Sequence, residues 1–385
     1  MRATNEAAFV GGNLRVARNL HGLTLAELGE KVTLSHSAIH HFETELRRPT
    51  ESLVVALAQA LDVTPSYFGV PIREEFREEE CHFRSEKIPG PAKTRVLAHG
   101  TLFGLFVENV ALHLKAARLR LPPPSLPSER ASGKESVERV AEMCRRTLGL
   151  GLDRPILSMV RVLEGRGVVV TRFEASIKAH DAVKIDAFSR LGSKRPVVVL
   201  NADKGSTSRA RWDMAHELGH LVLHGGLRPG DIEQEKDADF FASAFLLPRT
   251  GFLKEFPQQS KLNWDTVFTI KRRWGASAAS IVRRAFDLGR IDALEYRRSW
   301  KHYMYRHWHK GEPDEPADEP PEMVRNSLKH IATRTGATPR HLAQELGWMP
   351  AMLNRIVGED AAWEEPEIPV DGARVIPFRR TQVGS

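Results

Sequence analysis

The spacing of apolar residues at the start of the chain predicts a group of short helices. Within residues 11–70, apolar side chains recur every three or four positions over 25–32 and again over 53–61, which is the period of one helix face. Thr24 comes directly before the first stretch and Glu27 follows three residues later, a capping-box pattern. Ser35 and Thr50 stand at the expected starts of the next two helices. We therefore expect an all-α N-terminal domain.

Beyond this block, helical and extended patterns alternate. A helical stretch and a proline-rich run come first, and three β-rich runs then precede a series of helices. The expected elements are a helix at 91–120, a stiff linker at 121–127, strands within 167–173, 184–190 and 195–201, helices at about 207–224 and 234–246, and further helices over 260–310. Proline fixes the backbone and removes a donor, so the linker should be extended. This order predicts an α+β domain with a small sheet, followed by an α-helical extension.

We divide the chain into seven segments on these patterns, and we find no internal repeat of useful length. The segments are an N-terminal helical domain (1–70), a helical and proline-rich connector (71–135), the α+β domain (136–250), a basic helical extension (251–311), an acidic proline-rich hinge (312–322), a small helical segment (323–360) and a disordered tail (361–385). The fold class is thus multi-domain.

Composition narrows the class of protein. With 385 residues, 41% hydrophobic and 27% charged, the chain is typical of soluble proteins of two or three domains. No apolar run is long enough to cross a bilayer, and the start has no signal-peptide core, so we expect a cytoplasmic protein without membrane contact. Cys81 and Cys144 lie far apart and outside any CxxC motif, which argues against a disulfide framework or a cysteine zinc finger.

The net charge of +7 is unevenly distributed. Residues 1–70 hold six Lys and Arg against seven Asp and Glu, whereas residues 271–310 hold eleven against three. The basic stretch also contains Trp274 and Trp308, so it is a candidate nucleic-acid surface. We favour the alternative of a solvated helix face with its aromatic rings packed inward, onto which the acidic segment 312–322 could fold.

Residues 216–220, His-Glu-Leu-Gly-His, lie in an apolar stretch with helical spacing. Side chains four positions apart project from one helix face, so His216 and His220 have the spacing at which two imidazoles hold one Zn²⁺. Glu217 stands beside the first histidine and could accept a proton from water that zinc acidifies. Two histidines on an ordinary helix are the alternative. The small Gly219 would let another element approach closely.

The next predicted helix offers the third ligand. Glu235 precedes a buried stripe that includes Ala238 and Phe241, and Asp239 lies one turn further on. Two histidines and one glutamate leave a fourth coordination position open for water, which is the arrangement of a catalytic zinc site.

The segment from about Ser136 to Pro248 resembles the ImmA/IrrE family of zinc metallopeptidases. The matching features are the strand at 196–201, Ser206 and Arg209 before the HELGH helix, the Glu-x-x-Ala-x-x-Phe-Ala of residues 235–242 and the Leu-Leu-Pro of 246–248. The resemblance implies a zincin-like metallo-endopeptidase fold, zinc ligands His216, His220 and Glu235, and Glu217 as general base. Glu233 competes for the place of third ligand.

Two further residues are candidates for supporting roles around the zinc. Asp239 could accept the second ring N–H of a ligand histidine, or it could be a solvent-facing helix acid. His224 continues the face of His216 and His220. It could polarise a substrate carbonyl, or it could simply suit a helix C-terminus.

Residues 11–70 resemble the Cro and lambda-repressor type of helix-turn-helix domain, the XRE type. Arg18, the helix at 23–32, Glu43 and the Arg-Arg-Pro-Thr of residues 47–50 carry the match. In this fold the third helix enters the major groove, which makes His36, Ser37 and His40 candidates for base contacts and Arg47 and Arg48 for phosphate contacts. Thr33 occupies a turn position where glycine is common.

Together these features predict a transcriptional regulator that binds a double-stranded DNA operator as a homodimer and hydrolyses a specific partner protein, with a repressor as the candidate substrate. The nearly neutral charge of residues 1–70 argues against DNA binding, because non-specific DNA affinity comes mainly from phosphate neutralisation. DNA binding would then need dimerisation or basic residues elsewhere. The alternatives are a non-enzymatic transcription factor whose zinc domain is a sensor or scaffold, and an antitoxin-like or phage-derived module that binds protein.

Overall fold

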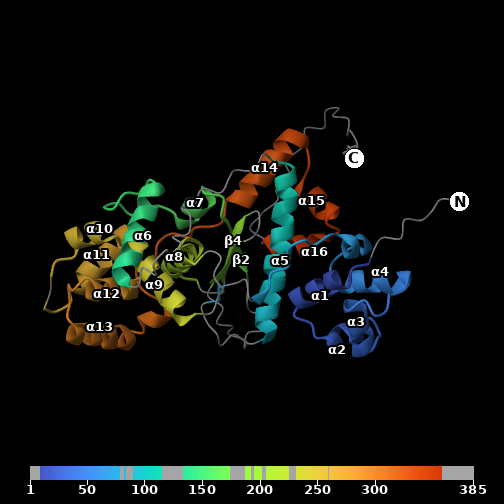
Figure 1. Ribbon diagram of the computed structural model, residues 1–385, viewed down its shortest axis with the longest axis horizontal. Helices are drawn as coiled ribbons and strands as arrows, with labels where there is room; N and C mark the ends of the chain where they lie inside the picture. Colours follow the sequence, from blue (N-terminus) through green and yellow to red (C-terminus); the bar gives the residue numbers. More distant parts are fainter. Residues whose placement is uncertain are drawn as a thin grey trace.

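The computed structural model describes residues 9–78, 82–83, 90–114, 133–173, 187–191, 195–201, 205–224, 231–258 and 260–357. The linker predicted at 121–127 and the tail predicted at 361–385 lie outside these residues. The described part of the chain is elongated, with a helical lobe on either side of a small sheet (Figure 1). This arrangement confirms the predicted fold class of helical N-terminal domain, α+β domain and helical C-terminal region.

The N-terminal lobe consists of short helices joined by tight turns. They are α1 (Gly11–Leu20), α2 (Leu25–Lys31), α3 (His36–Glu43), α4 (Glu51–Ala60) and the 3₁₀ helix η1 (Pro65–Gly69). Thr24, Ser35 and Thr50 cap α2, α3 and α4 through side-chain hydrogen bonds, as the sequence predicts. Inside the lobe, Arg18 donates to both carboxylate oxygens of Glu43, at 2.6 and 2.8 Å, which ties α1 to the end of α3.

The sheet separates two hydrophobic clusters. Its strands are β1 (His82–Phe83), β2 (Val169–Phe173), β3 (Ala187–Leu191) and β4 (Pro196–Asn201), in the order β1-β3-β4-β2. Strands β2 and β4 are parallel, and β3 is antiparallel to β1 and β4. Val197 and Val199 face one cluster, whereas Val198 and Leu200 face the other. Burial on both faces of the sheet explains why the central strand β4 reads as a continuous apolar run.

The second lobe packs against one face of this sheet. Its helices are α6 (Lys134–Thr147), α7 (Met159–Glu164), α8 (Thr207–Leu223), α9 (Ile232–Leu246), α10 (Arg249–Glu255), α11 (Trp264–Trp274), α12 (Ala278–Asp287), α13 (Ala293–Tyr305) and η4 (Trp308–Lys310). Part of the basic stretch lies inside this lobe, where the buried Arg284 pairs with Glu138 and Lys271 is fully covered. Trp300 and Tyr305 are exposed, so only some of the aromatic rings pack inward.

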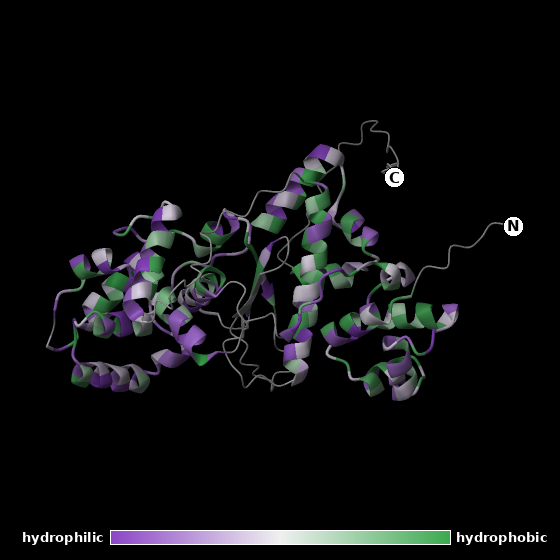
Figure 2. Ribbon diagram, viewed as in Figure 1, coloured by the Kyte–Doolittle hydropathy of each residue, from purple (hydrophilic) through white to green (hydrophobic). Residues whose placement is uncertain are grey.

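The other face of the sheet is covered by α5 (Gly90–Leu112) and by the C-terminal helices. These are α14 (Met323–Thr335), α15 (Pro339–Glu345) and α16 (Pro350–Val357). They share one hydrophobic cluster with α1–α4, so the two ends of the described chain meet beside α5 (Figure 1). The helices around both clusters carry hydrophobic and hydrophilic residues (Figure 2), as amphipathic helices do. Among the described residues, no helix is both long and apolar enough to cross a membrane.

Residues 312–322, expected to be a hinge, form instead an extended segment held along its length, which we call the acidic strap. Glu312 accepts from the backbone N–H of Ala278 at 2.7 Å, at the start of α12. Glu319 accepts from the N–H of Met159 at 2.6 Å, at the start of α7. The first N–H groups of a helix have no partner within it and carry partial positive charge. Carboxylates at these positions therefore satisfy the helix ends.

The strap also neutralises buried cations. Glu312 pairs with Lys271 at 2.7 Å, and Glu319 pairs with Arg211, whose side chain is 3% exposed. Arg272 in the basic stretch pairs with Asp314 at 2.6 Å. The acidic segment thus folds back onto the basic helices, and it also reaches α7 and α8. The strap is a structural part of the second lobe.

Replacing Glu319 by Ala should destabilise the protein by about 3–5 kcal/mol, because it leaves the buried guanidinium of Arg211 without its counter-charge. Replacing Glu322 by Ala is the matched control, since its partner Arg161 is 72% exposed and surface pairs contribute little. Urea unfolding followed by circular dichroism measures both variants. Equal shifts of the two transitions would contradict a structural role for the strap.

Candidate metal centre

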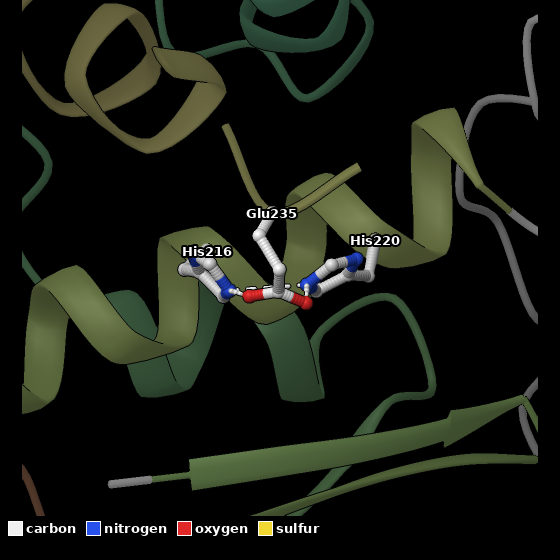
Figure 3. Close-up of side chains that lie close together, drawn as sticks. All are labelled: His216, His220 and Glu235. Carbon is white, nitrogen blue, oxygen red and sulfur yellow. Dashed lines mark hydrogen bonds and ion pairs between the residues drawn. The ribbon is translucent and has the colours of Figure 1, made fainter. Parts of the chain in front are cut away.

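Helix α8 presents two buried histidines on one face. Its N-cap Ser206 accepts from the N–H of Arg209, and the helix then runs without interruption through His216 and His220, each 1% exposed. Their Nε2 atoms point toward each other and lie 3.0 Å apart (Figure 3). Two buried imidazole nitrogens that lie this close together are unusual unless a proton or a metal ion lies between them.

Helix α9 brings the third side chain to the same point. Glu235 extends between the histidines (Figure 3), with one carboxylate oxygen 3.3 Å from His216 Nε2 and the other 3.3 Å from His220 Nε2. The close packing of α8 and α9 depends on Gly219. A Cβ atom there would lie 3.1 Å from the Phe241 ring and 3.3 Å from Ala238 Cα, tighter than ordinary contact. The expectation that Gly219 permits a close approach is confirmed.

The three side chains fit a zinc ion. Their ligand atoms all lie within 4.8 Å of one another. Atoms at the corners of a tetrahedron with zinc bonds of about 2.0–2.1 Å are about 3.3–3.4 Å apart, close to the separations between the glutamate oxygens and the imidazole nitrogens. Two neutral imidazoles and one carboxylate are also a common donor set for zinc with an open position. The residues present therefore fit the metal.

The electrostatic environment of His216 and His220 favours a positive charge between the two rings. Burial lowers the pKa of His216, but hydrogen bonds to Asp239 and Glu235 outweigh it and raise the pKa to about 9. Burial opposes ionisation of Glu235, yet its hydrogen bonds to His216 and His220 hold its pKa well below the usual range. The surrounding carboxylates thus stabilise a cation between the histidines, whether a proton or a metal ion.

The outer nitrogens of both histidines have partners as well. His216 Nδ1 lies 3.0 Å from a carboxylate oxygen of Asp239, and His220 Nδ1 lies 3.1 Å from His224 Nδ1. Burial lowers the pKa of His224 to about 4, so this ring is neutral and can serve as donor or acceptor. Partners at Nδ1 fix the ring orientation and leave Nε2 as the inward atom.

Glu217 is 1% exposed, and its Oε2 atom has no hydrogen-bond partner among the described residues. Burial raises the pKa of its carboxyl to about 7, although the positive charge of His216 and the hydroxyl of Ser189 on β3 act to lower it. Such a group can both accept and release a proton near neutral pH. By contrast, Glu233 pairs with Lys236 at the surface and is 70% exposed. It lies outside the cluster of ligand atoms.

The acidic strap supplies contacts that the sequence did not indicate. Glu315 accepts from the N–H of Ser208 at 2.9 Å and from the hydroxyl of Ser206 at 3.0 Å, both at the start of α8. It also pairs with the buried Lys271 at 2.6 Å. These bonds hold the first turn of the helix that carries both histidines. The regular spacing of glutamates between prolines was the available signal, but the same pattern is typical of a solvated hinge.

The candidate DNA contacts lie apart from this centre, on the N-terminal lobe. His36, Ser37 and His40 are exposed on α3, whose buried face holds Ile39 and Phe42. Arg47 and Arg48 are exposed in the turn after α3. Thr33 adopts φ 58° at the turn between α2 and α3, the left-handed conformation expected at that position.

Comparisons with known families agree with both parts of the chain. Residues 14–68 match the family model described as helix-turn-helix, and residues 164–286 match the model described as IrrE N-terminal-like domain, a peptidase family. The search of curated proteins found no match. The second match contains His216, His220 and Glu235 and extends through α12. The two matches agree with the fusion that the sequence predicts, an XRE-type helix-turn-helix domain followed by a metallopeptidase-like domain similar to the IrrE N-terminal-like family.

Proposed function

We propose that this protein is a cytoplasmic, DNA-binding regulator whose zinc site hydrolyses a peptide bond in a specific partner protein, with a repressor as the candidate substrate. The observation that carries the enzymatic half is the meeting of His216, His220 and Glu235 next to the buried Glu217. The family match supports a metallopeptidase-like domain. The choice of a repressor rests on the fusion to a DNA-binding domain.

In this proposal His216, His220 and Glu235 hold zinc and leave one position open to solvent or substrate. Zinc bound there would polarise the scissile carbonyl and bring the pKa of a coordinated water to about 7. Glu217 then accepts the proton of the attacking water at its unpartnered oxygen and passes it to the leaving amine. Asp239 and His224 keep the imidazole rings oriented through their Nδ1 atoms.

The DNA-binding half depends on the exposed face of α3. His36, Ser37 and His40 line the side of this helix that other elements leave uncovered, the position from which a recognition helix reads the major groove. Arg47 and Arg48 follow it and are placed to meet phosphates. A homodimer would present two such helices to successive half-sites.

A non-enzymatic sensor is the second candidate. The acidic strap favours this candidate. Its Glu315 contacts the start of α8, the helix that carries both histidines, and the strap leads directly into the C-terminal helices, which share a hydrophobic cluster with the N-terminal lobe. The buried Glu217 favours the enzyme, since a metal site used only for sensing has no need of a proton acceptor next to its ligand.

Replacing Glu217 by Gln should leave zinc content unchanged and lower cleavage by about 10²–10⁴-fold, the usual contribution of a general base. Lysate of the source cells is incubated with wild type or variant, and new protein N-termini are labelled and counted. Termini that form with the wild type, and are lost with both the variant and a chelator, identify the substrate. Equal cleavage by the variant would refute the assigned role.

The identity of the third ligand is tested by replacing Glu235 with Gln, with Glu233→Gln as the matched control. The first change should weaken zinc binding at least tenfold, about 1.4 kcal/mol or more, because it removes the anionic ligand. The second should leave affinity unchanged because that side chain points to solvent. Competition titration with a zinc chelator measures both. The reverse order of affinities would make Glu233 the ligand.

Replacing His40 by Glu should weaken DNA binding about tenfold, roughly 1.4 kcal/mol, because it places a negative charge on the face of α3 that would enter the major groove between two rows of phosphates. Gln59→Glu adds the same charge on an exposed position of α4 in the same lobe and is the control. Fluorescence anisotropy with labelled duplex measures the affinity. Equal losses would show that α3 has no special place in binding.

A further inference from the structure

The last two helices repeat the arrangement of α2 and α3 in order and in length. Helices α2 and α15 each have seven residues, and α3 and α16 each have eight. The turn between the helices is also of equal length, so residues 24–43 correspond to residues 338–357 without insertion or deletion. This correspondence lies in the arrangement of the helices and is not a repeat of the amino-acid sequence. The repeat escapes sequence comparison because only two pairs are identical, Thr24 with Thr338 and Leu28 with Leu342.

Local geometry agrees between the two segments. Thr24 and Thr338 each cap their helix in a capping box. At the turn, Thr33 and Gly347 occupy equivalent positions, and both are left-handed, with φ of 58° and 69°. The turns are closed by equivalent bonds, from Leu34 N–H to Gly29 O at 2.8 Å and from Trp348 N–H to Ala343 O at 2.9 Å.

The buried and exposed faces correspond as well. The core positions Ile39 and Phe42 of α3 have the buried counterparts Leu353 and Ile356 in α16. The four exposed residues of α3 correspond to four exposed residues of α16; they are His36, Ser37, His40 and His41 in the first helix and Pro350, Ala351, Asn354 and Arg355 in the second. Helix α16 thus leaves uncovered the face that a recognition helix uses.

The second unit is fixed to the first. Its turn donates and accepts backbone hydrogen bonds with the segment after α4, from Thr64 N–H to Gly347 O at 2.8 Å and from Met349 N–H to Asp62 O at 3.1 Å. Trp348 stacks on Phe106 of α5 at 5.7 Å. The two units therefore pack into one block, and in Figure 1 helix α1 lies between α15–α16 and α2–α3.

Charge distinguishes the two units. Residues 1–70 carry one more acidic than basic residue, whereas residues 323–357 carry five Lys and Arg against one Glu. Lys329, Arg334 and Arg340 are exposed, and within the described part of the chain no ion pair engages them. Arg340 lies in the first turn of α15, at the place where the first helix of a helix-turn-helix crosses the DNA backbone.

We propose that α14–α16 form a second helix-turn-helix unit that binds duplex DNA and supplies the phosphate contacts that the nearly neutral first unit lacks. This inference rests on the proposed function in one respect, that the protein binds DNA. Repetition of fold, exposed helix face and cationic surface together favour DNA over a protein partner for this unit.

The test uses the full chain and a duplex of random sequence of about 30 base pairs, because phosphate contacts need no operator. Lys329, Arg334 and Arg340 are replaced together by Ala. The control replaces Arg139, Arg146 and Lys254 by Ala, three exposed basic residues of the second lobe with the same total change in charge. Anisotropy titrations at several salt concentrations give the affinity and the slope of log K against log salt.

The C-terminal triple variant should bind more weakly and lose about 0.9 of slope for each phosphate contact removed, while the control keeps the wild-type slope. If wild type binds duplex and the two triple variants behave alike, the second unit makes no specific phosphate contacts and the inference is overturned, with a protein-binding role left for the unit. If wild type itself binds no duplex of random sequence, the chain makes no non-specific phosphate contacts and the inference is overturned, whereas the proposed operator contacts of α3 are tested separately by the His40→Glu variant.

Discussion

The close packing of α8 on α9 is the contact on which the metal centre depends. Gly219 lies between His216 and His220 in sequence and faces Ala238 and Phe241 on the other helix. Without a side chain there, the helices approach far enough for the carboxylate of Glu235 to reach both Nε2 atoms at 3.3 Å. A larger residue would force α9 outward, and the histidine pair would remain buried with no anion beside it, which is costly in an apolar lobe.

The acidic strap explains how the two lobes can form one structure. Its glutamates occupy the N-termini of α7, α8 and α12 and neutralise Lys271 and Arg211 in the interior. Glu164 at the end of α7 in turn accepts from the N–H of Met323 at 2.9 Å, at the start of α14. The same short segment therefore holds the histidine helix and sets the start of the C-terminal helices. In the proposed function, the acidic strap is therefore the covalent and electrostatic link between the metal centre and the part of the chain that binds DNA.

The sequence predicted the parts of the site that depend on local geometry. The spacing of His216 and His220 follows from the helix period, and the capping residues Thr24 and Ser35 mark their helices directly. The choice between Glu233 and Glu235 could be argued only from the buried stripe of α9, because two acids two positions apart cannot both face α8. The pairing of the strands is long-range and was not predicted. A close approach of another element to α8 was indicated by Gly219, but nothing local identified Ala238 and Phe241 as the residues it meets.

Other features could not be predicted because their sequence signals have more common explanations. Acids between prolines at 312–322 are typical of a solvated hinge, and nothing local shows that Glu315 and Glu319 lie against helix ends. Basic residues at 271–310 suggested a charged surface, yet Lys271 and Arg284 are buried with carboxylates from distant segments. The second helix-turn-helix retains the burial pattern of the first but almost none of its residues, since many apolar side chains fill the same core positions.

X-ray absorption at the zinc edge of the purified protein shows whether His216, His220 and Glu235 hold one metal ion. We expect one zinc per chain with only nitrogen and oxygen ligands at about 2.0–2.1 Å, including the scattering pattern of two imidazole rings. A sulfur shell at about 2.3 Å, a single imidazole, or protein that retains no zinc after purification would contradict it.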